Sequence, residues 1–240
     1  MLVSIIICSY NSADSLDGAL YSALSQDFSS DEYEVLLVDD GSTDATVELA
    51  GAYGKRHGNF RYVRLPLNKG MSTACDYGLL TARGKYFTGL DADDALHPRM
   101  LAECVAPLEQ GLTDLVYCDY HDVDLADGSH RHIRLDCFDP IGMVGSAAML
   151  RMDAFRALYR RGGSSVNGGN EPDIYQTYIQ ASGRPPYHVP RPLYYRCPRG
   201  RKSVSSENFV APKLSMHDTF SDRVPVTQAT SPVEGRTRMA

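Results

Sequence analysis

Apolar runs of strand length alternate with helix-like segments over the first half of the chain. Residues 2–9 form a continuous run of branched apolar side chains, which is typical of a strand covered on both faces. In residues 16–24 the apolar side chains recur three and four positions apart, as on the buried face of a helix. The pattern predicts strands over residues 2–9, 33–40, 60–66, 85–91 and 115–120, and helices that begin near residues 12, 42, 71 and 98.

This alternation predicts an α/β protein with a mostly parallel sheet and helices on both faces. In such sheets ligands bind beyond the carboxyl ends of the strands. Polar clusters follow three of the predicted strands, at residues 9–11, 39–42 and 91–94. Because these strand ends meet at one edge of the sheet, we expect the clusters to line a single crevice.

The second half of the chain is less regular. A short strand that runs into a helix is predicted within residues 142–158, a glycine-rich loop followed by a helix at 166–183, and an extended segment at 188–197. From about residue 206 the apolar density falls and Pro, Ser and Thr accumulate. We therefore expect one domain over residues 1–205 and a C-terminal tail over 206–240, disordered or docked on the domain.

Composition and charge limit the classes of partner. The formal net charge of −6 argues against a broad nucleic-acid-binding surface. No apolar run reaches the roughly 20 residues that span a bilayer, and the N-terminus lacks the features of a signal peptide. The six cysteines show no C-x-x-C spacing, as expected of buried, reduced thiols. The prediction is a cytoplasmic protein without a transmembrane segment, at most peripheral at the membrane face.

The acids that follow the predicted strand at residues 85–91 raise a question of charge. Asp91 and Asp93 can converge on one point, and carboxylates about 4–6 Å apart repel one another unless a cation lies between them. Mg²⁺ is usually held by such carboxylates together with substrate phosphates. The pair therefore predicts a divalent-cation site. The alternative is that the acids only stabilise the N-terminus of the helix after Pro98.

The turns after the first two strands offer groups that suit a nucleoside. A carboxylate within residues 39–44 can accept hydrogen bonds from a base or a ribose, and Tyr10 offers a face on which a base can pack. Each has a structural alternative. Residues 39–44 also read as a strand-to-helix turn with a capping hydroxyl, and Tyr10 as a half-buried aromatic residue.

Taken together, the segments LVSIIICSYN, VLLVDDGSTDAT, NKGMSTACDYGLLTARGKYFTGLDADD and LHP resemble glycosyltransferase family 2 in their order and spacing. The resemblance runs from residue 2 to about 205. It implies the GT-A fold, a Rossmann-like sheet with a smaller acceptor-side region. Residues 1–120 would bind the nucleotide-sugar, and residues 121–205 the acceptor and the catalytic base.

The resemblance implies an inverting, hexosyl-type transfer from a nucleotide-diphosphate sugar to an acceptor hydroxyl in glycan or polysaccharide biosynthesis. UDP-sugars are the family's commonest donors, and the acceptor would be a glycan, a lipid-linked sugar or a small molecule. The family holds Mg²⁺ or Mn²⁺ on the donor diphosphate, and the matching metal positions are Asp91 and Asp93. The matching donor-binding positions are Cys8, Ser9, Tyr10, Asn11, Asp40, Asn68, Lys69, Gly70, Asp91 and Ala92.

The family usually takes its catalytic base from a Glu–Asp pair that lies two residues ahead of a further Asp. Residues 168–175 read GGNEPDIY, which places Glu171 at the base position where Asp is usual. We predict Glu171 as the base, with Asp173 in reserve. The alternative is that both acids only complement the dipole of a helix that begins at Pro172.

A basic segment, PLYYRCPRGRKSVS, matches the family's arginine-containing loop. Arg196 or a neighbouring cation at 199–202 could cover the diphosphate, unless this is simply a solvated loop. His97 is predicted to be a surface or packing residue, whereas His188 and His217 are open candidates for a third metal ligand.

Two other functions stay open at this point. One is a non-catalytic nucleotide-sugar-binding subunit of a glycan assembly complex, which the departure at Glu171 motivates. The other is a sugar-nucleotide pyrophosphorylase, which would need a glycine-rich, arginine-containing loop after the first strand. The chain reads SYNSADS there, which argues against it.

Overall fold

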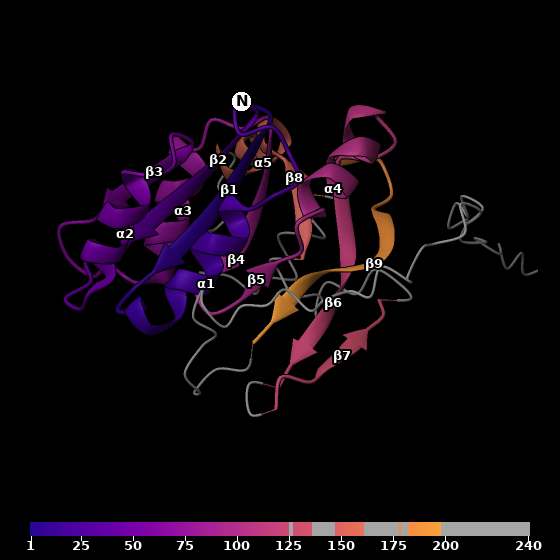
Figure 1. Cartoon of the computed structure of the whole chain (residues 1–240). Helices are drawn as coiled ribbons and strands as arrows, with labels where there is room; N and C mark the ends of the chain where they lie inside the picture. Colours follow the sequence, from indigo (N-terminus) through magenta and orange to yellow (C-terminus); the bar gives the residue numbers. More distant parts are fainter. Residues whose placement is uncertain (125–126, 136–146, 161–177, 179–181, 198–240) are drawn as a thin grey trace, which may run out of the picture. The chain divides into compact units, whose positions relative to one another are not determined.

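Figure 1 shows the computed structural model of the chain, which describes residues 1–124, 127–135, 147–160, 178 and 182–197. All of these residues belong to one unit, Met1–Phe209. The loop and helix predicted at 166–183 lie almost wholly outside the described residues, and the tail predicted at 206–240 lies wholly outside them.

Four strands of the first half form the parallel part of the sheet. They are β1 (Val3–Ser9), β2 (Tyr33–Asp39), β3 (Phe60–Arg64) and β4 (Tyr86–Asp91). They pair in the order β3-β2-β1-β4, and every residue of β1 and β2 is buried. The register sets Ser9 beside Asp39 and Cys8 beside Asp91. The predicted strands are confirmed, and three of them end at one edge of the sheet.

Three helices connect these strands and cover both faces. They are α1 (Ala13–Leu24), α2 (Thr46–Gly54) and α3 (Met71–Thr81). Leu16 of α1 shares an apolar core with Ile5 and Ile7, whereas Ala74 of α3 shares a second core with Ile6. Because successive side chains of a strand point to opposite faces, α1 and α3 lie on opposite sides of the sheet.

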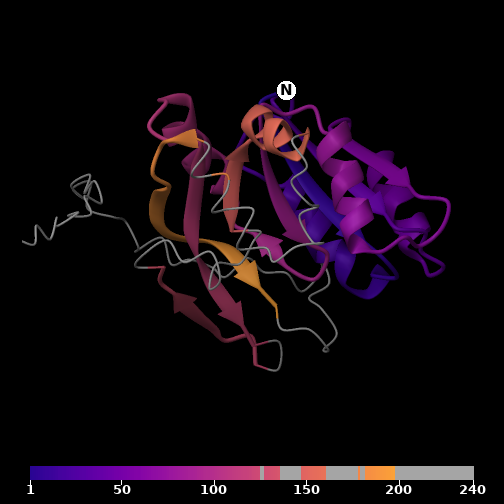
Figure 2. The same cartoon turned by 180° about the vertical axis from the view of Figure 1, so that it is seen from behind.

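The other half of the sheet, formed by residues 95–196, has strands of both directions. Its elements are β5 (Ala95–Leu96), α4 (Met100–Glu109), β6 (Leu115–Val123), β7 (His130–Ile133), β8 (Ala148–Arg151), α5 (Met152–Arg160) and β9 (Tyr187–Arg196). β8 is antiparallel to β4 and β6, β9 is parallel to β6, and β5 is antiparallel to β9. The order is β3-β2-β1-β4-β8-β6-β9-β5, with β7 paired to β6 beside this path. Figure 2 shows this half from behind.

The elements predicted at 115–120, 142–158 and 188–197 are confirmed as β6, β8 with α5, and β9. The strands β5 and β7 were not predicted. β5 has two residues, and β7 reads HRHI, a mostly exposed and polar segment without a strand pattern. The sheet is therefore parallel in its first half and mixed in its second half.

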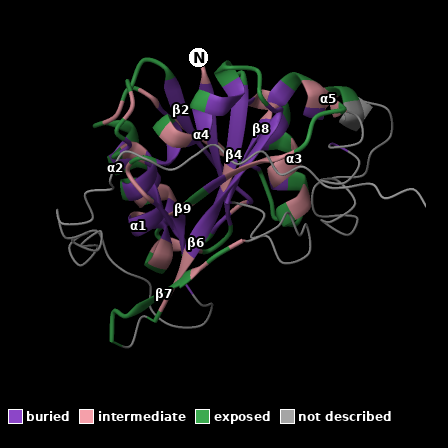
Figure 3. Cartoon of the chain, turned by 90° about the vertical axis from the view of Figure 1, so that its right-hand side faces the viewer, coloured by how far each residue is buried: buried purple, intermediate pink, exposed green. Residues whose placement is uncertain are grey.

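Burial follows the same division. Buried residues concentrate in the central strands, whereas β7 at the edge is exposed or half-buried (Figure 3). Among the helices that the structure describes, none combines the length and the apolar character needed to cross a bilayer.

Candidate functional site

The carboxyl end of β4 leads into a turn that carries three acids. Carboxylate oxygens of Asp91, Asp93 and Asp94 lie within 4.8 Å of one another, and the backbone N–H of Asp94 donates to the carbonyl of Asp91 at 3.1 Å. Asp91 is exposed, Asp93 is half-buried and Asp94 is buried. Oxygen donors at this spacing fit a hard divalent cation such as Mg²⁺ or Mn²⁺. The structure thus brings the two predicted metal ligands together with a third acid.

Asp94 differs from the other two acids because strand β9 engages it. Its carboxylate accepts the hydroxyl of Tyr194 at 2.5 Å and the backbone N–H of Cys197 at 2.7 Å. Burial raises the pKa of Asp94 to about 7; the charges of Asp91 and Asp93 add to the rise, and the two hydrogen bonds oppose it. Asp94 therefore ties the acid turn to β9. No role was predicted for Asp94, although it lies next to Asp93 in the D-A-D-D segment.

The end of β1 lies beside the acid turn. A hydrogen bond with Cys75 and burial raise the pKa of Cys8, and the charges of Asp91 and Asp40 raise it further. The thiol therefore lies near acids from both neighbouring strand ends. Ser9 is fully buried, and its Oγ has no hydrogen-bond partner within the described part of the chain. Cys75 of α3 was not predicted as a site residue, although it lies within one of the family motifs.

The turn after β1 interlocks with the turn after β2. The backbone N–H of Asn11 donates to Ser42 Oγ at 2.9 Å, and Asn11 Oδ1 accepts the N–H of Thr43 at 2.8 Å. Asn11 has a φ of 50°, which an asparagine tolerates better than most residues. Tyr10, next in the same turn, is 41% exposed. The turn thus keeps an accessible aromatic ring at the sheet edge.

Asp40 holds the loop that precedes α3. Its buried carboxylate accepts the N–H of Lys69 at 2.9 Å and of Gly70 at 2.8 Å. Gly70 N–H also donates to Asn68 Oδ1 at 3.0 Å. Asp40 therefore positions residues 68–70 beside the strand ends. Its predicted contact with a nucleoside stays a prediction.

Arg196 is engaged by Asp122 of β6. Its Nε donates to Asp122 Oδ1 at 2.6 Å, and its guanidinium lies 5.0 Å from the centre of the Tyr120 ring. Its predicted contact with a diphosphate stays a prediction. The other cations of that segment, at 199–202, lie outside the described residues.

The predicted base and the candidate histidines are placed as follows. Glu171, Asp173 and His217 lie outside the described residues. His188 lies outside the acid turn, because its Nε2 is 2.8 Å from Asp119 Oδ1. His97 is half-buried, and its Nδ1 accepts the N–H of Arg99 at 3.1 Å.

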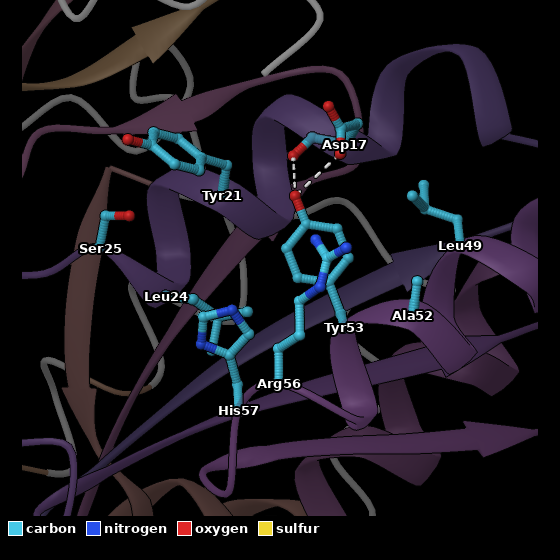
Figure 4. A pocket seen from close by; sticks show the side chains of 9 residues that line it. All are labelled: Asp17, Tyr21, Leu24, Ser25, Leu49, Ala52, Tyr53, Arg56 and His57. Atoms are coloured by element: carbon cyan, nitrogen blue, oxygen red, sulfur yellow. Dashed lines mark hydrogen bonds between the residues drawn. The ribbon is translucent and has the colours of Figure 1, made fainter. Parts of the chain in front are cut away.

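A separate hollow of about 390 Å³ lies between α1 and α2 (Figure 4). Tyr21, Tyr53 and Arg56 contribute to its lining, and the Tyr53 hydroxyl donates to Asp17 Oδ1 at 2.8 Å. None of the predicted site residues lines it. The candidate site is therefore at the strand ends and not in this hollow.

Sequence comparison identifies the family. The profile of Glycosyl transferase family 2 matches residues 4–163, so the chain belongs to this family. Cholesterol galactosyltransferase of Borreliella burgdorferi is 33% identical over 124 residues, which is 52% of this chain and 34% of that protein. The uncharacterized glycosyltransferase EpsJ of Bacillus subtilis is 34% identical over 120 residues, which is 50% of this chain and 34% of EpsJ. The chain spans about a third of the length of these two relatives.

Structural comparison confirms the predicted GT-A fold. S. aureus TarS 1–349 in complex with UDP-GlcNAc superposes with a TM-score of 0.70 at 21% identity, over 86% of this chain and 61% of that one. The mannosyltransferase PcManGT of Pyrobaculum calidifontis, in complex with GDP-Man and Mn²⁺, gives a TM-score of 0.63 at 19% identity, over 87% of this chain and 59% of its own. At these identities the likeness concerns the fold.

Proposed function

We propose that this chain is an inverting glycosyltransferase that moves a sugar from a nucleotide-diphosphate sugar to an acceptor hydroxyl, with Mg²⁺ or Mn²⁺. The observation that carries the proposal is the cluster of carboxylates within 4.8 Å directly after β4, beside the ends of β1 and β2. Family membership and the nucleotide-sugar complexes of TarS and PcManGT support it. We infer that the donor is a UDP-sugar, so a UDP-sugar is the first donor to test.

In this proposal, the residues that bind the metal, the nucleoside and the acceptor have separate roles. Asp91 and Asp93 hold the cation, which when bound offsets the charge that develops on the departing nucleotide diphosphate. Tyr10 packs against the base, and Asp40 keeps residues 68–70 in place beside it. Glu171 accepts the proton of the acceptor hydroxyl, with Asp173 in reserve.

Metal-dependent nucleotide binding tests the proposal. Calorimetric titration of UDP and of GDP, each with and without Mn²⁺, should show binding that requires the metal. Asp93→Ala should abolish this metal-dependent binding, because it removes one of two ligands. Asp31→Ala, which changes an exposed acid far along the chain from the turn, is the matched control. Unchanged Mn²⁺-dependent binding in Asp93→Ala would reject the proposal.

A non-catalytic nucleotide-sugar-binding subunit is the second candidate, favoured by the unusual Glu171 at the base position. It predicts the same metal-dependent binding without turnover. Release of UDP from a UDP-sugar, with water or a sugar as acceptor, would exclude it.

A further inference from the structure

Three histidines meet on the β6–β7 hairpin. His121 of β6 lies directly opposite His132 in the antiparallel pairing with β7, and His130 lies two residues before His132. Residues two apart on a strand share a face, so all three rings are on one face of the hairpin. The ring centres of His121 and His130 are 5.3 Å apart, and those of His121 and His132 are 5.6 Å apart.

This spacing is close to that of imidazoles around one ion. With metal–nitrogen distances of about 2.0–2.1 Å and tetrahedral angles, the ring centres of two histidine ligands stand about 5 Å apart. In the structure, the nitrogens of the three rings do not all lie within 4.8 Å of one another. Among the described residues, the aspartate turn is the group whose ligand atoms come that close. Rotation of the side chains, two of which are exposed, would be needed to close the site.

Hydrogen bonds set which nitrogen of two of the rings carries the proton. His132 Nε2 lies 2.9 Å from the buried carboxylate of Asp119, and an ionised carboxylate only accepts. His130 Nδ1 lies 3.1 Å from the carbonyl of Gly128, which also only accepts. With these hydrogen bonds kept and the rings neutral, His132 Nδ1 and His130 Nε2 carry the lone pairs. Histidines that bind metals almost always donate their other N–H to a carboxylate or a carbonyl in this way.

The third ring supplies an independent observation. The Nδ1 atom of His121 is buried and has no hydrogen-bond partner among the residues that the structure describes. Leaving a buried polar atom unsatisfied costs free energy, so such an atom calls for a ligand. An ion bound at this nitrogen would satisfy it.

We propose that His121, His130 and His132 bind a divalent transition-metal ion, Zn²⁺ in the first place. Three imidazole nitrogens suit Zn²⁺, with a water molecule in the fourth position, whereas the oxygen-only acid turn suits Mg²⁺ or Mn²⁺. The site is separate from the acid turn and does not depend on the proposed function. Its structural effect is to join the exposed edge strand β7 to β6.

Zinc binding by the untagged full chain tests the proposal. Titration with Zn²⁺ in excess Mg²⁺, which competes with Zn²⁺ for exposed carboxylates, should show one bound equivalent, and Co²⁺ in its place should give the visible absorption of a tetrahedral site. Asp119→Asn should weaken Zn²⁺ binding by about 10–100-fold, as loss of a supporting hydrogen bond does elsewhere. His130→Asn removes a ligand and should weaken it at least as much.

Two controls make the outcome decisive. His57→Asn changes a histidine outside the hairpin and should bind Zn²⁺ as the wild type does, and so should Asp93→Ala. His130 is exposed, so circular dichroism should show that His130→Asn is folded. Absence of a bound equivalent in the wild type, wild-type affinity in His130→Asn, or loss of Zn²⁺ binding in Asp93→Ala would each overturn the proposal.

Discussion

The parallel half of the sheet, β1 to β4, and the mixed half, β5 to β9, differ in how far their contacts can be predicted from the sequence. In the parallel half, buried apolar strands pack against helices on both faces. In the mixed half, β6, β8 and β9 also bury apolar side chains, and polar contacts join segments far apart in the chain, as Asp94 does with Tyr194 and Cys197. Burial of an apolar strand is a property of its own sequence, whereas a polar contact needs its partner. The elements of the parallel half are therefore predictable from local sequence, whereas β5, β7 and the polar contacts of the mixed half are not.

One buried carboxylate in each half shows the contrast in detail. Glu34 on β2 accepts hydrogen bonds from the side chains of Ser4 and Arg61 and from the backbone N–H of Arg83. Asp119 on β6 accepts from His132 of β7, His188 of β9 and the backbone N–H of Leu135. Both carboxylates link neighbouring strands, but Glu34 relies on a permanent cation and Asp119 on two imidazoles.

The largest expected effect separates binding in the first half from chemistry in the second. Glu171→Gln should slow release of UDP from a UDP-sugar by about 10²- to 10⁴-fold, because the amide accepts no proton. Binding of UDP with Mn²⁺, measured by calorimetry, should stay at the wild-type level. Glu109→Gln, on the surface of α4, is the control. Normal turnover in Glu171→Gln would move the base to Asp173.

A smaller effect is expected where the backbone of the first half is crowded. Gly41 has a φ of 78°, and a Cβ there would lie 2.8 Å from the carbonyl carbon of Leu67. Gly41→Ala should lower the free energy of unfolding by about 2–4 kcal/mol in urea titrations, from backbone strain and overpacking, and should weaken nucleotide binding. Gly51→Ala, in open space on α2, should be neutral or stabilising. Equal stability of the two variants would contradict this explanation.

The next prediction compares the pH response of Glu34 with that of its amide variant. Burial alone would raise the pKa of Glu34, but hydrogen bonds from Arg61, Ser4 and Arg83 outweigh it and hold the pKa below the usual 4.5. A depressed pKa in the folded state stabilises the fold above pH 4.5, and this contribution is lost as the pH falls through the folded-state value.

Glu34→Gln should therefore lower the free energy of unfolding by about 1–3 kcal/mol at pH 7, with the difference from the wild type shrinking below the usual pKa of Glu. Denaturant titrations at a series of pH values measure it. Asp119→Asn provides the parallel series in the mixed half, where the pKa of Asp119 is also lowered. A pH-independent difference for Glu34→Gln would show that the carboxylate charge plays no part.

The smallest effect is expected at the contact between α1 and α2 in the parallel half. Tyr53→Phe removes the hydroxyl that donates to Asp17 and should lower the free energy of unfolding by about 0.5–1.5 kcal/mol. Tyr77→Phe, which changes a 39% exposed tyrosine on α3, should leave it unchanged within error. Equal losses in the two variants would show that the hydrogen bond contributes nothing measurable.

Much of the fold could be predicted because the signals are local. The strands β1, β2 and β4 lie within a residue or two of their predicted bounds, since each is an apolar run that ends in polar residues. β5 escaped prediction because its two residues become a strand only by pairing with Tyr194 and Tyr195, about a hundred positions away. β7 escaped because its polar side chains lie at an edge that needs no apolar face.

The candidate site divides in the same way. The acids at 91 and 93 and the family motifs were visible because they occupy short stretches. The hydrogen-bond partners of three charged residues were not visible in the sequence. Asp40 bonds to Lys69 and Gly70, Asp94 bonds to Tyr194 and Cys197, and Arg196 bonds to Asp122. Asp40 and Arg196, both predicted to touch the donor, have protein partners in the structure, so their assignment to the donor stays a prediction.

By itself the sequence determined the family, the parallel half of the sheet and the edge at which its acids gather, because hydrophobic periodicity and linked motifs depend on neighbouring residues. Only the tertiary structure decided which acids accept hydrogen bonds from distant parts of the chain, and that three histidines meet on one hairpin. The physical reason is that a hydrogen bond or a ligand set is defined by distance in space, and strand pairing brings together residues that no local pattern relates.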